Sequence, residues 1–133
     1  MNVEEIEGIG AAQGQKLAKA SIKTVEGLLK AGATRSGRKK IAEESGISEE
    51  KILDWVNMAD LFRIKGVASQ FAELLKVSGV DTIKELRNRN AENLHAKLTE
   101  INAEKKVTRV VPSLSLITDF IEQAKNLEPV ITH

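Results

Sequence analysis

A short motif of glycine and aliphatic residues occurs twice in this chain at a fixed spacing. Ile6–Gly10 (IEGIG) returns 58 residues later, counted from Ile6 to Ile64, as Ile64–Ala68 (IKGVA). The same offset aligns five further pairs: Leu17 with Leu75, Ile22 with Val80, Thr24 with Thr82, Val25 with Ile83 and Leu28 with Leu86. Two copies of one pattern restrict the chain to folds that are built from two similar units.

A second alignment joins the last helical segments of the two copies. Trp55–Phe62 matches Phe120–Leu127 at an offset of 65 residues, counted from Trp55 to Phe120. The two offsets differ by seven, so the second copy has an insertion, which we place around residues 91–109. We predict a single domain over residues 1–133. Repeat 1 occupies residues 1–62, repeat 2 residues 63–127, and residues 128–133 form a tail that we expect to be frayed.

Helical patterns cover nearly the whole chain, because apolar residues recur at helical spacing and Ser or Thr precedes several of these runs. The predicted helices span residues 11–20, 25–31, from 34 or 36 to the stop at 46, from the cap at 48 to about 62, 69–78, 83–89, 91–102 and from 112 or 113 to 126. Only residues 106–111 resemble a strand, and the run is short. We therefore expect an all-α fold with two repeats packed as one compact pseudo-two-fold domain.

The composition argues against several classes of function. The chain has no cysteine and only two histidines, and it contains no serine elbow of the hydrolase type, so we predict a protein that is not an enzyme and binds no metal. We expect no small-molecule substrate. No apolar run is long enough to span a membrane. The first residues are acidic, unlike a signal peptide, so we predict a cytoplasmic protein without a membrane partner.

Aromatic residues are too few for a surface that stacks nucleic-acid bases. The chain has one Trp, three Phe and no Tyr. Trp55 has helical spacing from Ile52 and Ala59, so we expect it to pack in the core rather than to anchor a partner. The composition therefore argues against binding of single strands through aromatic stacking.

The two glycine motifs have the chemistry of an anion site. Glycine allows positive φ, so neighbouring backbone N–H groups can point outward together. The helix that follows adds its unpaired N–H groups and the positive end of its dipole. Ile9 and Val67 lie between the small residues of each motif, and we expect both side chains to turn inward and fix the turn to the core. Such a site binds the nucleic-acid backbone and does not read bases.

The doubled motif resembles the helix-hairpin-helix motif, which occurs in tandem in DNA ligases, excision nucleases and the Holliday-junction branch-migration protein. Over about residues 3–127 the chain resembles, more specifically, an uncharacterised bacterial family of paired helix-hairpin-helix domains. The resemblance implies binding of duplex DNA across the minor groove, with one phosphate held on each strand. It assigns the phosphate contacts to the backbones of Gly8, Gly10, Gly66 and Ala68. It also implies that hairpin carbonyls can hold a monovalent cation; no other cofactor is expected.

Each copy departs from the motif in a different way. Glu4, Glu5 and Glu7 surround the first hairpin, and carboxylates repel phosphate at short range. The second hairpin has favourable basic neighbours, Arg63 and Lys65. It carries Ala68 at the position of the second glycine, which we expect to expose its N–H groups less well.

Two clusters of basic residues extend the candidate site. Arg35, Arg38, Lys39 and Lys40 form the denser one and are candidates for phosphate contacts, each adding to a salt-dependent affinity. Lys105, Lys106 and Arg109 form a smaller cluster in the inserted segment. The alternative for both clusters is a solvated helix face.

The sequence leaves two functions open. The first is non-enzymatic, sequence-independent binding of duplex or branched DNA through the two hairpins. The second is a protein–protein interaction or assembly module, in which the hairpins are only structural turns. The net charge of +1, from 20 Lys and Arg against 19 Asp and Glu, suits the second function better, because nucleic-acid-binding domains are usually more basic.

Overall fold

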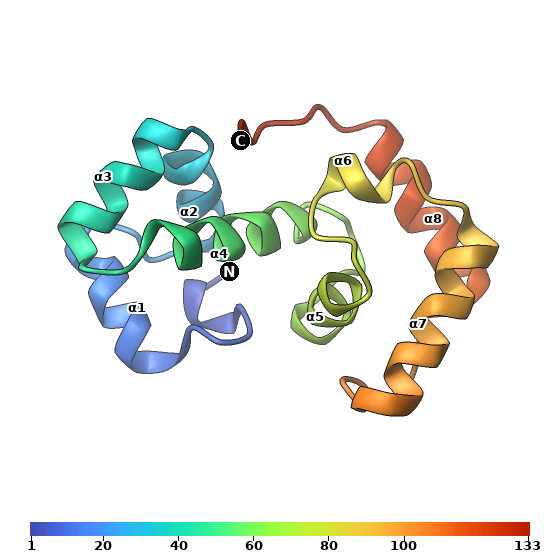
Figure 1. Cartoon of the computed structure of the whole chain (residues 1–133). Helices are drawn as coiled ribbons and strands as arrows, with labels where there is room; N and C mark the ends of the chain where they lie inside the picture. Colours follow the sequence, from blue (N-terminus) through green and yellow to red (C-terminus); the bar gives the residue numbers. More distant parts are fainter. The chain divides into compact units, whose positions relative to one another are not determined.

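The computed structural model describes residues 1–133 and contains helices only (Figure 1). Eight α-helices and one short 3-10 helix are present, and the sole β interaction is an isolated bridge between Asn2 and Thr24. The prediction of an all-α fold is confirmed. None of the helices is both long and apolar enough for a bilayer crossing.

The helices lie close to their predicted positions. In chain order they are η1 (Val3–Glu5), α1 (Gly10–Lys19), α2 (Val25–Gly32), α3 (Arg35–Ser45), α4 (Glu49–Leu61), α5 (Ser69–Val77), α6 (Ile83–Leu86), α7 (Ala91–Lys105) and α8 (Leu114–Lys125). The main differences are α6, which ends at Leu86 and not at residue 89, and α7, which continues past its predicted end at Asn102. Helix α7 ends at Lys105, and the C-cap residue Lys106 adopts the left-handed conformation with φ 50° and donates its N–H to the Asn102 carbonyl. Glycine usually occupies such a position, so the sequence did not signal this end.

The chain divides into two compact units, which we describe separately. Unit 1 contains residues 1–60 and 130–133, and unit 2 contains residues 61–129. The single domain and the repeat boundaries inferred above remain predictions.

Unit 1 is built from η1 and α1–α4. Helix α3 packs against both α1 and α2, and η1 packs against α1. Gly32 allows α4 to approach α2, because a Cβ at this position would lie 2.5 Å from a methyl group of Val56. Trp55 is buried, as expected of a core residue.

The C-terminal segment is ordered by hydrogen bonds, so the prediction of a frayed tail is wrong for residues 130–133. The Thr132 N–H donates to the Ala33 carbonyl at 2.8 Å, and the Thr132 carbonyl accepts from Arg38 at 2.7 Å. His133 Nε2 lies 3.4 Å from Asn57 Oδ1. The sequence gave no indication of these contacts because their partners lie 76 to 99 positions away.

Unit 2 contains α5–α8. Helix α7 packs against α5 and α8, and α6 packs against α8. The Phe71 and Phe120 rings lie 6.4 Å apart at a tilted angle of 56°, a favourable aromatic geometry. Residues 106–111 are not a strand but a loop between α7 and α8.

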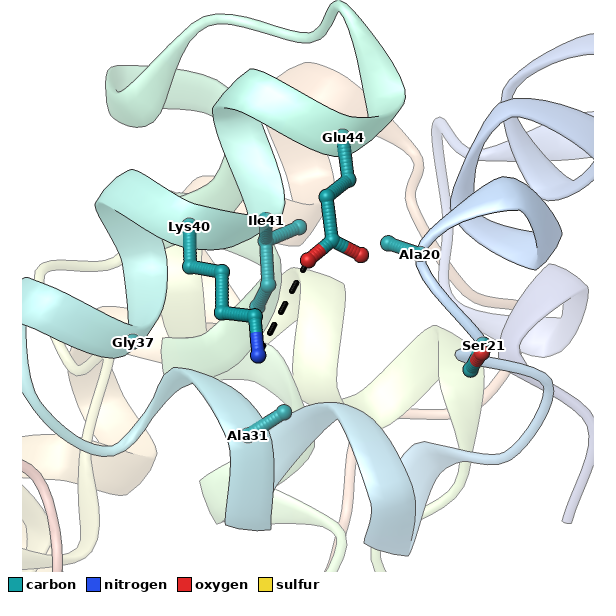
Figure 2. Close-up of a pocket in the computed structure, with 7 residues that line it drawn as sticks. All are labelled: Ala20, Ser21, Ala31, Gly37, Lys40, Ile41 and Glu44. Carbon is teal, nitrogen blue, oxygen red and sulfur yellow. Dashed lines mark ion pairs between the residues drawn. The ribbon is translucent and has the colours of Figure 1, made fainter.

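Ser21 stores backbone strain at the end of α1. It has φ 64°, whereas Gly79, its counterpart at the offset of 58, has φ 94° in unit 2. The Ser21 side chain is exposed and borders a pocket (Figure 2). We expect Ser21→Gly to raise the free energy of unfolding by about 0.5–1 kcal/mol, because glycine adopts this conformation without steric cost. Urea unfolding measures the change. The reverse exchange, Gly79→Ser, should destabilise; a less stable Ser21→Gly protein would contradict the argument.

Candidate nucleic-acid interface

The first hairpin exposes its glycines and buries its aliphatic residues. Gly8 and Gly10 have φ 93° and 63°, and both are exposed. Ile6 and Ile9 are buried, and the Ile9 N–H donates to the Ile6 carbonyl at 3.2 Å. The inward orientation predicted for Ile9 is confirmed. The turn is therefore fixed to the core while its glycine backbone faces outward.

The second hairpin also buries two aliphatic residues, but it has alanine where the first hairpin has its second glycine. Ile64 and Val67 are buried, and the Val67 N–H donates to the Ile64 carbonyl at 3.1 Å. Gly66 has φ 97°. Ala68 has φ −106° and ψ −175°, which is extended backbone that any residue adopts. Alanine therefore costs this turn nothing, contrary to the effect expected from loss of the second glycine.

Helix α8 holds the second hairpin through a side chain that the sequence did not single out. Gln123 accepts from the Lys65 N–H at 2.8 Å and donates to the Lys65 carbonyl at 3.0 Å. Asp119 accepts a further hydrogen bond from the same amide nitrogen at 2.9 Å. The Lys65 N–H is thus occupied, so Lys65 offers only its exposed side chain to a ligand. Nothing in the local sequence around Gln123 indicates a partner 58 residues away.

Helices α1 and α5, which follow the hairpins, differ from the others at their N-termini. Their N-cap residues, Ile9 and Ala68, make no side-chain capping bond. A side-chain oxygen caps each of the other six helices: Thr24 before α2, Thr34 before α3, Ser48 before α4, Thr82 before α6, Asn90 before α7 and Ser113 before α8. The first N–H groups of a helix have no partner within it. Only the two hairpin helices leave them without a capping side chain.

A hollow of about 250 Å³ lies at the start of α5. Its lining residues are Gly66, Ala68, Ser69, Gln70 and Phe71. These residues include the hairpin glycine and the first three residues of α5. The hollow therefore lies where the unpaired N–H groups and the positive end of the helix dipole are found.

Two of the three acidic residues near the first hairpin have structural roles that the sequence did not reveal. Glu5 accepts from the Asn2 N–H at 2.9 Å and completes a capping box on η1. Glu4 lies against α1, because a Cβ on Gly14 would come within 2.6 Å of the Glu4 side chain. Gly14 thus makes room for Glu4. Glu7 remains exposed beside Gly8.

Arg63 and Arg38 are engaged within the fold. Arg63 donates to the Glu128 carbonyl at 2.7 Å. Arg38 is only 4% exposed, and its guanidinium donates to the carbonyls of Gly32 at 2.9 Å and Ala33 at 3.2 Å. Burial lowers the pKa of Arg38, and the nearby charge of Arg35 lowers it further. The assignment of Arg38 as a phosphate contact does not agree with its burial. A buried guanidinium that is bonded to backbone carbonyls is structural.

The remaining basic residues of that cluster, Arg35, Lys39 and Lys40, are exposed on α3. Lys40 lies 3.9 Å from Glu44 in a weak surface ion pair. Figure 2 shows this pair at the edge of a pocket of about 330 Å³ between the end of α1, α2 and α3. The three side chains therefore remain available to a ligand.

Comparison with known proteins places the chain in one family. The family described as a domain of unknown function (DUF4332) matches residues 7–127, so the chain belongs to this family. No curated protein and no solved structure matches the chain.

Proposed function

We propose that this chain is a non-enzymatic DNA-binding domain with two helix-hairpin-helix repeats. In this proposal the backbone N–H groups of Gly8, Gly10 and Ala11 in the first hairpin, and of Gly66, Ala68 and Ser69 in the second, bind phosphates of duplex or branched DNA, independently of base sequence. The N–H groups of Ile9 and Val67 are occupied by hydrogen bonds within the turns. The observation that carries the proposal is the pair of uncapped helices. Six helices have a capping side chain, and the two without one both follow a glycine hairpin. An anion would satisfy the same N–H groups that a capping side chain satisfies elsewhere.

Exposed basic side chains would strengthen such binding. Lys65 lies in the second hairpin, and Arg35, Lys39 and Lys40 lie on α3. Each one that neutralises a phosphate releases condensed counterions, so affinity falls as salt rises. The two hairpins occupy equivalent positions in the sequence repeats, which suits a pseudo-two-fold arrangement with one contact to each strand.

A protein–protein interaction module is the second candidate. The net charge of +1 favours it. The bonds from Gln123 to the Lys65 backbone favour it as well, because they give the second hairpin a structural role. A measurement of DNA binding distinguishes the two candidate functions, because only the first requires it.

Titration with duplex, nicked and branched DNA tests the proposal. We expect binding at low salt. The logarithm of the association constant should fall linearly with the logarithm of the salt concentration, with a slope of about −0.9 for each phosphate that the protein neutralises. Fluorescence anisotropy over 20–200 mM salt measures it. Absence of binding to all three DNA forms at the lowest salt rules the proposal out.

The double variant Ala11→Glu/Ala68→Asp tests the hairpin helices without weakening the fold. Ala68 stands at an uncapped N-cap with extended backbone, so aspartate there supplies the missing cap and stabilises α5 by about 1 kcal/mol. Glutamate in the first turn of α1 also suits the helix dipole. Both carboxylates occupy the proposed phosphate positions. We therefore expect unchanged or raised thermal stability together with loss of DNA affinity of at least about tenfold, or about 1.4 kcal/mol.

Gln15→Glu/Ala96→Glu is the matched control. It adds the same two negative charges at exposed positions in the middle of α1 and α7. It should weaken binding much less than the hairpin variant. Equal loss in both double variants would show that net charge, and not the hairpins, governs binding.

A further inference from the structure

The loop that ends the inserted segment carries three cations and is held in one place. Lys105, Lys106 and Arg109 are exposed and take part in no ion pair. Asn102 fixes the loop: its amide donates to the Thr108 carbonyl at 2.9 Å and accepts from the Thr108 N–H at 3.0 Å. The cations are thus attached to an ordered turn at the end of α7.

This loop lies beside the second hairpin. Thr108 Oγ1 is 3.3 Å from Gln70 Oε1, and Gln70 lines the hollow at the start of α5. Arg109 follows Thr108 directly, so its Cα lies about 3.8 Å from that of Thr108. No acidic residue lies between Lys105 and Val110. The loop that borders the hollow therefore carries three positively charged side chains and no negatively charged one.

We propose that the loop Lys105–Val110 is a second contact of unit 2 with the DNA backbone. It rests on the proposed function above. A phosphate at the start of α5 would be bound by backbone N–H groups, and Lys105 and Arg109 would bind a neighbouring phosphate of the same DNA. Lys106 adds a third positive charge to the loop. Since the insertion is present in the second repeat only, the second hairpin binds DNA more tightly and with a steeper salt dependence than the first.

Asn102 is a positioning residue in this proposal, because it touches the loop and not the DNA. Removing its amide leaves every charge in place but releases the loop from its fixed position. Asn102→Ala should therefore weaken DNA binding several-fold, while Asn93→Ala, an exposed asparagine on the same helix, should leave it unchanged.

The charge test uses the double variant Lys105→Gln/Arg109→Gln on the full chain and a 20-base-pair duplex. We expect affinity at low salt to fall at least about tenfold and the salt slope to decrease by about 1.8, the value for two phosphate contacts. The control is Lys84→Gln/Lys97→Gln, which removes two exposed charges from α6 and α7 of the same unit. Its slope should change by less than about 0.5, because neither lysine lies in the loop or the hairpin. Circular dichroism verifies that both variants are folded.

The outcomes separate this inference from the proposed function. If the unaltered protein binds no DNA form at low salt, both fail. If the unaltered protein binds, Ala11→Glu/Ala68→Asp abolishes binding, and Lys105→Gln/Arg109→Gln matches its control, the hairpins bind DNA and the loop inference alone is overturned. A larger effect of the loop variant than of its control, together with weaker binding by Asn102→Ala, supports it.

Discussion

Replacement of Arg38 by methionine is expected to lower the free energy of unfolding by about 3 kcal/mol, the cost of leaving buried partners of a charged donor without hydrogen bonds. The Arg38 guanidinium donates to the carbonyls of Gly32 and Ala33 at the end of α2 and to Thr132 in the C-terminal segment. A positive charge there also suits the negative end of the α2 dipole. Methionine keeps most of the apolar stem and removes all three bonds. Urea unfolding followed by circular dichroism measures the loss.

Arg35→Met is the matched control for this substitution. Arg35 lies three positions earlier on α3 and is exposed. Its replacement should change stability by less than about 0.5 kcal/mol, as is usual at exposed positions. The two variants should have the opposite order in DNA binding: Arg35→Met lowers the salt slope by about 0.9, whereas Arg38→Met, measured where it is folded, leaves it unchanged. A stable Arg38→Met protein with a reduced salt slope would show that Arg38 contacts DNA.

The features that could be predicted from the sequence depend on residues close together in the chain. Thr24 and Thr82 indicate helix starts, because a cap bonds to an N–H three positions later, whereas the sequence leaves the next start open between Thr34 and Ser36 and the structure places it at Thr34. The glycine turns and the inward orientation of Ile9 and Val67 can be predicted for the same reason, because they depend on residues within one short motif. The missing caps of α1 and α5 were equally visible, since neither isoleucine nor alanine has a capping oxygen.

The features that could not be predicted depend on partners far apart in the sequence. Arg38 has the same appearance as its exposed neighbours, and only the fold brings Thr132 to it, 94 positions away. The contacts of Gln123 with the Lys65 backbone and of Thr108 with Gln70 also join residues far apart in the sequence. For the candidate site, local sequence thus indicated the turns but not what surrounds them.

Gly8 and Gly66, which occupy the same position in the two hairpins, should differ in their sensitivity to a single added carbon. Both Gly8 and Gly66 have φ above 90°, which strains any residue with a Cβ. A Cβ at Gly8 would have no atom within 4 Å, whereas a Cβ at Gly66 would lie 3.0 Å from Phe120 Cε1. We expect Gly8→Ala to cost about 1–2 kcal/mol from strain alone. Gly66→Ala should cost about 3 kcal/mol, because overpacking against a buried ring adds to the strain.

A double-mutant cycle with Phe120→Leu isolates the packing contribution. Leucine has no atom at the Cε1 position, so in the Phe120→Leu background Gly66→Ala should cost no more than Gly8→Ala does in the unaltered protein. The coupling energy between positions 66 and 120 should then be about 1–2 kcal/mol, within the range for residues in contact. Chemical unfolding of the four proteins measures it. A coupling energy near zero would mean that Phe120 yields to the new methyl group and that strain alone accounts for the need for glycine in the second hairpin. A coupling of the expected size means that α8 fixes the second hairpin through Phe120 as well as through Gln123.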